Sequence, residues 1–487
     1  MRLPYPFELE WMEGDSLNTV WRILQNKKIY IEPVLEYIPN IYTPFYFHLS
    51  EFVTKIFGFN ILVLRFISVI SSILLFFLVY LFINRETGSF FFSLVGIGLM
   101  STTFNITSGW YDLARVDNLF VFLLFLSVYL IRNLRSNLRI ILSALILYLA
   151  FYTKQTSLFI FFSMTIFVLS RSPRKALYYG LAFLLPTVIT FLVLNHNTDG
   201  WFYYYCFELP SQHALIKKYI HYFWTNEIFL KFGIPFIISI IYFIYYCHQK
   251  TKLLPSKELS SYLGFLRNDK ITYHIFVFVS MLLISWTMRI HSGSAINTLI
   301  PAYAAICIYA SIGFFTLFKN GKPIHKTVLY FLLLIQFVLL FYLPGRYVPG
   351  SEDKPAGYEF ISQLSSINGD IYIYNHPYYY HLAGKRPYFS IISLWDIARG
   401  DDNAISDNAR AIFHDALEDQ KWKAILIDYF GYSKALEKEY KILIQNYAPG
   451  KTVLNDPKEL ENLSGFYAKP RILLFPEIHY KNTITEH

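Results

Sequence analysis

Ten apolar segments of near-membrane length fill most of the first 345 residues, and they constrain the fold more than any other feature. A helix needs about 20 mainly apolar residues to cross a bilayer. The chain is 54% hydrophobic and 16% charged, whereas a soluble domain is about one quarter charged. This pattern predicts a polytopic α-helical membrane protein. The expected spans are 61–83, 89–107, 118–132, 139–153, 157–170, 176–194, 227–247, 272–290, 298–317 and 327–344.

Several of these segments are short for a full crossing. The pair 139–153 and 157–170 has two interpretations, either one long broken element or a re-entrant hairpin.

Basic residues are divided unequally between the two sets of loops, fifteen against five. Because short cytoplasmic loops carry the excess of Lys and Arg, the richer set is expected inside and both chain ends outside. An outer amino terminus also leads us to expect a further span before the first loop, the alternative being that the short tail crosses unaided. The richer set is Arg85, Arg132, Arg135, Arg139, Arg171, Arg174, Lys175, Lys250, Lys252, Lys257, Arg267, Lys270, Lys319, Lys322 and Lys326, and the poorer set is Arg115, Lys154, Lys217, Lys218 and Arg289.

The net charge of +9 therefore reflects topology, and it does not indicate a nucleic-acid partner. Cys206, Cys247 and Cys307 are odd in number and far apart. Their spacing predicts neither a disulfide framework nor a metal site.

Residues 346–487 differ in composition, since Gly, Pro, Asp, Asn and Lys return and no span-length apolar run remains. Segments 369–374 and 423–428 have the pattern of short buried strands. Helical patterns near 355–366 and 404–420 alternate with them. The alternation predicts a small α/β domain.

Four carboxylates precede the first span, at Glu8, Glu10, Glu13 and Asp15. Carboxylates at a membrane boundary are costly to desolvate, and they are suited to deprotonating a hydroxyl. The alternative is that they are solvated loop charges or helix caps. We expect a short helix from Asp15 to Leu24. We also expect an amphipathic stretch from Phe45 to Phe57 along the membrane surface.

Further polar groups are predicted at later outer turns. Asp117 begins a span and Arg115 lies two residues before it. This pair either closes a hairpin or forms a second acidic site with a cation for an anionic substrate. Lys154 and Gln155 lie between two short apolar runs, where a lysine either snorkels to the interface or binds phosphate.

The turn between the eighth and ninth spans adds Arg289, His291 and Asn297. His291 alone is more often structural than catalytic. Lys154, Arg289 and His291 together form a cationic set opposite the acidic one, which favours a lipid phosphate as ligand.

The order of these motifs resembles the integral-membrane glycosyltransferases of the GT-C type. The closest branch is glycosyltransferase family 39-like, with protein O-mannosyltransferases and aminoarabinose transferases. The resemblance covers roughly residues 5–345. It implies that the acidic residue of the first outer loop is the base, matched here by Glu13. Because Gly14 splits the family's acidic pair, Asp15 stays an alternative, and the second acidic site corresponds to Asp117.

The resemblance implies an inverting glycosyltransferase that moves a hexosyl or pentosyl group from a polyprenyl-phosphate donor. The acceptor would be a hydroxyl of a glycan, a lipid or a protein, at the outer face of a bacterial cytoplasmic membrane. Residues 1–345 would form the membrane domain, with its first outer loop at 1–60, and residues 346–487 the outer α/β domain. No cofactor is required. A divalent metal ion is compatible with the chemistry, although no ligand spacing indicates one.

The alternative functions are a polysaccharide polymerase and a flippase or transporter of lipid-linked oligosaccharides. Both would place their charges inside the bundle, and a transporter would add internal repeats. The charged motifs lie instead at the ends of the expected spans and no repeat is present. This placement favours the transferase.

Overall fold

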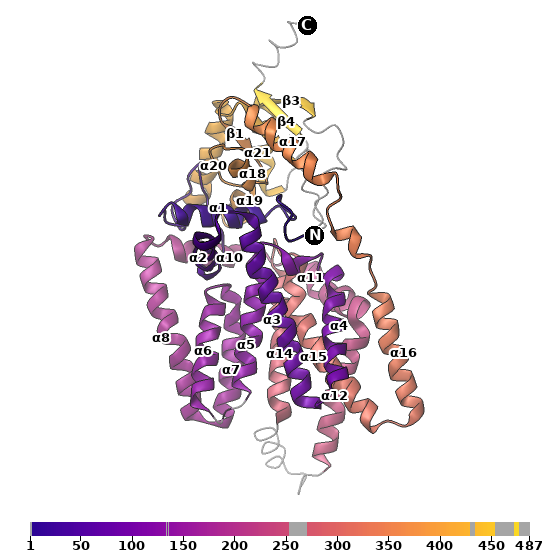
Figure 1. The fold of residues 1–487 in the computed structure, drawn as a ribbon. Helices are drawn as coiled ribbons and strands as arrows, with labels where there is room; N and C mark the ends of the chain where they lie inside the picture. The colour runs from indigo at the N-terminus through magenta and orange to yellow at the C-terminus, as the bar shows by residue number, and fades with distance from the viewer. Residues whose placement is uncertain are drawn as a thin grey trace.

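The protein is described by a computed structural model that covers residues 2–132, 134, 136–252, 270–428, 434–452 and 472–476. Helices occupy all ten expected spans (Figure 1). They are α3 (Ile61–Thr87), α4 (Phe90–Ile106), α5 (Asp117–Ile131), α6 (Asn137–Phe151), α7 (Leu158–Arg171), α8 (Pro173–Asn197), α12 (Lys231–Thr251), α14 (Lys270–Ile290), α15 (Ile300–Asn320) and α16 (Pro323–Leu339). The prediction of a polytopic helical protein is confirmed.

Five helical stretches within the described residues are long and apolar enough to cross a membrane, and five others are shorter, with 10–17 residues. The long ones are Ile61–Thr87, Pro173–Asn197, Lys217–Thr251, Lys270–Ile290 and Ile296–Asn320. The third of these joins α11 (Lys217–Tyr222), the π-helical η4 (Phe223–Leu230) and α12. The uncertain pair consists of two separate helices, α6 and α7, which are joined through the short 3-10 helix η2 (Gln155–Ser157).

Local sequence signals set the helix ends. The Asn60 side chain caps α3 by accepting the N–H of Val63 at 3.1 Å, and Gly88 ends this helix with φ +64°. Ser172 caps α8, and Pro173 occupies its first turn. Both patterns are preferred at helix termini because the first N–H groups and the last carbonyls have no partner inside the helix.

The first loop lies across one end of the helix bundle, which we call the domain end (Figure 1). It contains α1 (Glu13–Leu24) and α2 (Phe45–Phe57), so both expected helices are present. The turns from α3 to α4, α7 to α8 and α15 to α16 lie at the opposite end. These turns carry basic residues of the richer set. Arg135, Lys257 and Arg267, from the same set, lie outside the described residues.

The α/β domain packs beyond α1 and contains a four-stranded sheet in the order β1-β2-β4-β3 (Figure 1). β1 (Ile371–Ile373) pairs parallel with β2 (Ala424–Ile427), and β4 (Ile472–Pro476) runs antiparallel to β2 and to β3 (Tyr447–Thr452). The two predicted strands are confirmed as β1 and β2. The expected helices are confirmed as α17 (Asp353–Ser366) and α20 (Ala404–Glu418), whereas β3 and β4 were not anticipated.

The remaining helices of this domain are α18 (Tyr378–Leu382), α19 (Ile391–Ala398), α21 (Glu437–Asn446) and the 3-10 helix η7 (Lys434–Leu436). Short elements in the connecting segments are η1 (Trp110–Asp112), α9 (Trp201–Tyr203), the π-helical η3 (Tyr204–Glu208), α10 (Leu209–Gln212), η5 (Ile296–Leu299) and η6 (Pro344–Tyr347).

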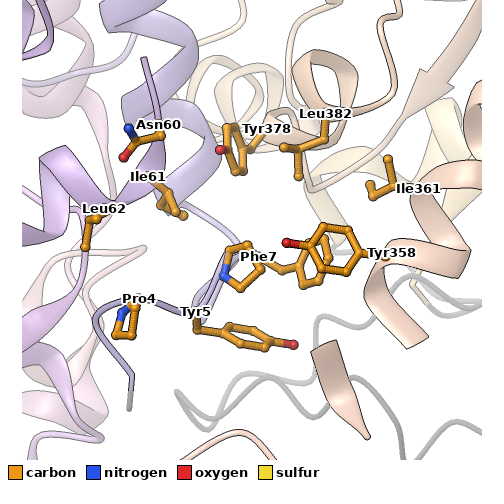
Figure 2. A pocket seen from close by; sticks show the side chains of 11 residues that line it. Pro4, Tyr5, Phe7, Asn60, Ile61, Leu62, Tyr358, Ile361, Tyr378 and Leu382 are labelled. Atoms are coloured by element: carbon orange, nitrogen blue, oxygen red, sulfur yellow. The ribbon is translucent and has the colours of Figure 1, made fainter. Parts of the chain in front are cut away.

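Two buried contacts join the first loop to the α/β domain. The His376 imidazole lies between two carboxylates, with Nδ1 bonded to Glu8 and Nε2 3.2 Å from Asp428. Beside it, Figure 2 shows Tyr5 and Phe7 with Tyr358 around a pocket of about 320 Å³. The residues that line this pocket carry no charged side chain. The lining of this pocket is mainly apolar and belongs to the packing between the first loop and the α/β domain.

Candidate active site

A cavity of about 770 Å³ lies at the domain end, between the membrane helices and the α/β domain. Three parts of the chain line it. The first loop contributes Glu10, Trp11, Met12, Ile41 and Tyr42; the turns of the bundle contribute Trp110, Arg115, Lys154, Gln155, Thr156, His213, Met288, His291, Asn297 and others; and the α/β domain contributes Tyr374, Asn375, Ile391, Ile392, Trp395, Asp396, Arg399 and Leu436. Chain segments that are far apart in sequence thus share one cavity, in which charged and polar side chains lie among a mainly apolar lining.

Glu13, the predicted base, does not line this cavity. Its carboxylate is fully buried and pairs with the equally buried Arg65 of α3, at 2.8 Å from Nε to Oε1 and 2.6 Å from Nη2 to Oε2. It also accepts the N–H groups of Leu9 at 2.7 Å and Ala114 at 2.8 Å. Burial by itself would raise the pKa of Glu13, but the Arg65 charge and these donors hold it below its usual value. These contacts indicate that Glu13 anchors the first loop to α3 and to the segment around Ala114.

Glu10 is the acidic residue of the first loop that forms part of the cavity wall. Its side chain has one bond from the N–H of Met12 at 3.1 Å. Burial raises its pKa to about 8, although the Arg115 charge opposes this shift. A carboxyl group with a pKa near neutral pH is suited to general base catalysis, because it can exchange a proton without a large energetic penalty.

Asp15 lies in the first turn of α1 and does not line the cavity, but it interacts electrostatically with Arg115 and Asp396, which do. Its Oδ2 atom is buried and has no hydrogen-bond partner among the described residues. Burial raises its pKa to about 8, with Arg115 again opposing the shift. The sequence alternative to Glu13 is therefore close to the cavity and less constrained than Glu13.

Arg115 lines the cavity with its guanidinium held between two aromatic rings. It lies 5.5 Å from the ring centroids of Tyr42 and Trp110, and it donates to the Tyr42 hydroxyl at 3.1 Å. Its Nε is buried and has no partner within the described part of the chain. Arg115 does not close a direct pair with Asp117, which bonds to Lys154 instead.

Lys154 and Asp117 form an ion pair, with 3.0 Å between Nζ and Oδ1. Asp117 begins α5, and Lys154 precedes η2 on the neighbouring hairpin. The ammonium group also lies 5.6 Å from the Tyr42 ring centroid. The lysine therefore points into the protein and not toward a membrane surface. It places a cation on the cavity wall beside Arg115.

Three further predicted residues lie at the same site. Gln155 donates to the carbonyl of Cys206 at 2.8 Å, and its buried Oε1 has no partner among the described residues. Asn297 also lines the cavity, and its buried Oδ1 likewise has no hydrogen-bond partner among the described residues. His291 lines the cavity, and burial lowers its pKa, so the imidazole is neutral at physiological pH.

Arg289 is the predicted substrate-binding residue that does not line the cavity. Its Nε lies 2.8 Å from Glu227, and its guanidinium stacks 3.8 Å from the Tyr219 ring centroid. These contacts hold the side chain behind Tyr219, which itself lines the cavity. Arg289 therefore supports the wall, and a phosphate-binding role for it stays a prediction without geometric support.

The α/β domain supplies cavity residues that the sequence analysis did not select. Arg399, Asp396 and Trp395 lie at the end of α19, and His213 reaches the same corner from the segment after α10. No motif marks these positions, because their proximity arises only when the domain docks on the bundle. Burial lowers the pKa of His213.

Comparisons with known proteins extend this description. The sequence model of a family described as dolichyl-phosphate-mannose-protein mannosyltransferase matches residues 42–202. A search of curated proteins finds no significant match. ArnT from Cupriavidus metallidurans in the apo state superposes with a TM-score of 0.59 at 11% identity, covering 97% of this chain and 94% of ArnT. This chain has the GT-C fold.

Two more structures agree with the GT-C assignment. ArnT bound to undecaprenyl phosphate gives a TM-score of 0.57 at 10% identity, again over 97% of this chain and 94% of ArnT. The Archaeoglobus fulgidus oligosaccharyltransferase in the apo form gives 0.53 at 10% identity, over 90% of this chain and 68% of that one. The predicted resemblance to GT-C type membrane glycosyltransferases is confirmed.

Within this GT-C fold, the cavity combines two kinds of group. Arg115 and Lys154 are fixed cations suited to an anionic oxygen. Glu10 and Asp15 are desolvated carboxyl groups suited to proton transfer. Among the described residues no cluster of three or more His, Cys, Asp or Glu side chains is arranged to hold a metal ion.

Proposed function

We propose that this protein is an inverting glycosyltransferase that uses a polyprenyl-phosphate sugar as donor. The observation that carries the proposal is the shared cavity wall, on which the Arg115 and Lys154 cations lie beside the Glu10 carboxyl group. The bundle residues that line the cavity lie at the ends of membrane helices and in the turns between them. A lipid-linked phosphate would reach it there with its isoprenoid tail in the bilayer.

In the proposed reaction an acceptor hydroxyl attacks the anomeric carbon of the donor sugar. The new bond joins the acceptor oxygen to this carbon, and the bond from the carbon to the phosphate oxygen breaks. Arg115 and Lys154 stabilise the negative charge on the departing lipid phosphate. The hydroxyl proton passes to a carboxylate of the first loop. A single displacement of this kind inverts the anomeric configuration.

Glu10 is the best placed base and Asp15 is the second candidate, because Glu10 lines the cavity and both carboxyl groups titrate near neutral pH. Glu13 anchors the loop through Arg65. Asp117 holds Lys154 in position. Gln155, His291 and Asn297 contribute polar contacts to the substrates.

The positive-inside distribution supports an orientation with the cavity and the α/β domain outside a bacterial cytoplasmic membrane. The domain boundary near residue 345 is part of the same proposal. A flippase or a polysaccharide polymerase would need charged groups along a path through the bundle. The charged residues of this cavity lie at the domain end, which favours transfer.

The experiment that tests the donor site compares Lys154→Ala with Lys28→Ala. Lys28 is an exposed lysine near Asp199, at 3.5 Å, and is the matched control. A charge-assisted bond to phosphate contributes roughly 1.5–3 kcal/mol. Lys154→Ala should therefore lower kcat/KM for the undecaprenyl-phosphate sugar by about tenfold or more, and Lys28→Ala should not. Unchanged donor kinetics in Lys154→Ala would remove Lys154 from the donor site.

A further inference from the structure

The cavity has a third cationic side chain, Arg399, on the wall formed by the α/β domain. One end of its guanidinium, Nη2, bonds to Asp396, and its plane lies 4.2 Å from the Trp395 ring centroid. The side chain is 9% exposed. Its Nε and Nη1 atoms are buried and have no hydrogen-bond partner within the described residues. Buried donors without partners are costly, so this corner is prepared for a ligand that supplies acceptor oxygens.

A turn of the membrane domain packs closely against the same guanidinium. Gly293, in the turn between α14 and α15, has φ +79°, and a Cβ built at this position would lie 1.5 Å from Nη1 of Arg399. A larger residue would displace the arginine. Glycine suits this position because of its positive φ, and its lack of a side chain leaves room for the guanidinium. The fit fixes Arg399 between two domains before any ligand arrives.

The charge balance at this corner disfavours an anionic ligand. Arg399 is neutralised by Asp396. His213 bonds through Nε2 to the main-chain oxygen of Asp396 at 2.8 Å. Burial and the Arg399 charge lower the pKa values of His213 and His291, so both rings are neutral at physiological pH. The corner thus offers hydrogen bonds without net charge, unlike the region around Arg115 and Lys154.

The cavity wall has both hydrogen-bond donors and hydrogen-bond acceptors without a partner among the described residues. Arg399 has free donors, whereas Gln155 Oε1 and Asn297 Oδ1 are buried acceptors without a partner in the described part of the chain. A ligand with several hydroxyl groups suits such a wall, because each hydroxyl donates one hydrogen bond and accepts others. Ile391 and Ile392 add apolar surface to the same wall. Vicinal hydroxyls on a carbon ring combine these properties.

From this arrangement we infer that the Arg399 corner binds a sugar ring of the acceptor, so that the acceptor is a glycan or a glycolipid. The inference rests on the proposed transferase function and names its acceptor class. Arg399 would orient the acceptor ring so that one hydroxyl faces the carboxyl groups of the first loop, while Arg115 and Lys154 hold the donor phosphate.

The test measures binding without any donor. Saturation-transfer NMR on the full-length protein in detergent uses methyl glycosides of common hexoses, a Ser/Thr-containing peptide and inorganic phosphate as probes. The variants are Arg399→Ala, Arg399→Gln as a milder second change, and Arg386→Ala as the control. Arg386 belongs to the same domain but is exposed and pairs with Glu36.

We expect the wild type and Arg386→Ala to bind at least one methyl glycoside, and both Arg399 variants to bind it about tenfold more weakly, the effect of one lost charge-assisted hydrogen bond. In the transfer assay Arg399→Gln should raise the acceptor KM and leave the donor KM within about twofold. Absence of glycoside binding in the folded wild type would overturn the inference. Peptide or phosphate binding that depends on Arg399 would also overturn it.

This design separates the two proposals. Glycoside binding that depends on Arg399, without any transfer from lipid-linked donors, would retain the sugar site and reject the transferase. Transfer that is unaffected by the Arg399 variants would retain the transferase and reject the sugar site.

Discussion

Replacing Glu13 by Gln should destabilise the protein more than it slows the chemistry. In the described part of the chain every hydrogen-bond partner of this carboxylate is a donor. Oε1 accepts from Arg65 at 2.8 Å and from the Ala114 N–H at 2.8 Å, and Oε2 accepts from Arg65 at 2.6 Å and from the Leu9 N–H at 2.7 Å. In either orientation the amide nitrogen of Gln would face two donors and leave the Arg65 charge buried without a counter-ion.

Removing one partner of a buried ion pair costs about 3–5 kcal/mol. Arg65 also donates to the main-chain oxygens of Tyr5 at 2.6 Å and Phe7 at 2.7 Å, so its displacement would loosen the whole segment before α1. The matched control is Glu36→Gln. Its ion pair with Arg386 is exposed and should contribute at most about 1 kcal/mol.

The assay is thermal unfolding of both variants in the same detergent, followed by donor turnover at a temperature where both are folded. Glu13→Gln should lower the apparent Tm clearly, and Glu36→Gln should not. Wild-type stability combined with a turnover loss of about 10²–10⁴-fold, typical of a missing general base, would refute this reasoning. That result would restore Glu13 as the base that the sequence predicted.

Three further predictions follow from the same geometry. Because a base acts when deprotonated and the pKa of Glu10 is raised to about 8, wild-type kcat/KM should rise with pH through this value. Glu10→Gln should lower activity by roughly 10²–10⁴-fold and remove this rise. A pH profile that is unchanged in Glu10→Gln would move the base to Asp15. The His376 pKa is raised to about 10 by Asp428 and Glu8 against the opposing effect of burial, and burial raises the pKa of Glu8 to about 7. The contact is therefore strongest just above pH 7 and is lost as pH rises toward 10; the Tm difference between wild type and His376→Gln should shrink over this range, and a constant difference would contradict it. With Cys introduced at exposed Lys27 and Lys322, at opposite ends of the bundle, an impermeant thiol reagent should label only the first in intact cells, and labelling of only the second would reverse the orientation.

The helical part of the fold was predictable because each span is a continuous apolar run, and some, such as α3 and α8, also carry a local end signal. The small strands β1 and β2 were predictable for the same reason, since their residues are continuously apolar and buried. β3 contains Pro449 and Gly450, residues that are rare in strands, and it has an irregular register with β4. β3 therefore forms a strand because it pairs with β4, and its own sequence does not predict one.

The site was predictable at the level of loops but not of individual side chains. The acidic first loop, Arg115 and Lys154 all meet at the cavity, as their positions at the span ends indicated. The position of Glu13 depends on Arg65, which the sequence analysis included in an apolar span. A lone arginine in such a span needs a buried counter-ion, and this signal was available. The corresponding signal for Arg289 was Glu227 at the start of an expected span.

Arg399 carried no such signal, because it follows a short amphipathic helix in a domain whose docking the sequence does not specify. Its importance appears only from the two donor nitrogens without a partner among the described residues and from Gly293, which packs directly against the guanidinium.

The central claim is that the protein transfers a sugar from a lipid phosphate. The most direct measurement is mass spectrometry on proteoliposomes that contain the purified protein, an undecaprenyl-phosphate sugar and a glycan acceptor, with the anomeric configuration of the product determined by NMR. The account predicts free undecaprenyl phosphate and a glycosylated acceptor of inverted configuration, both lost in Glu10→Gln. Donor lipid recovered chemically intact but moved to the opposite leaflet would contradict it and identify a flippase instead.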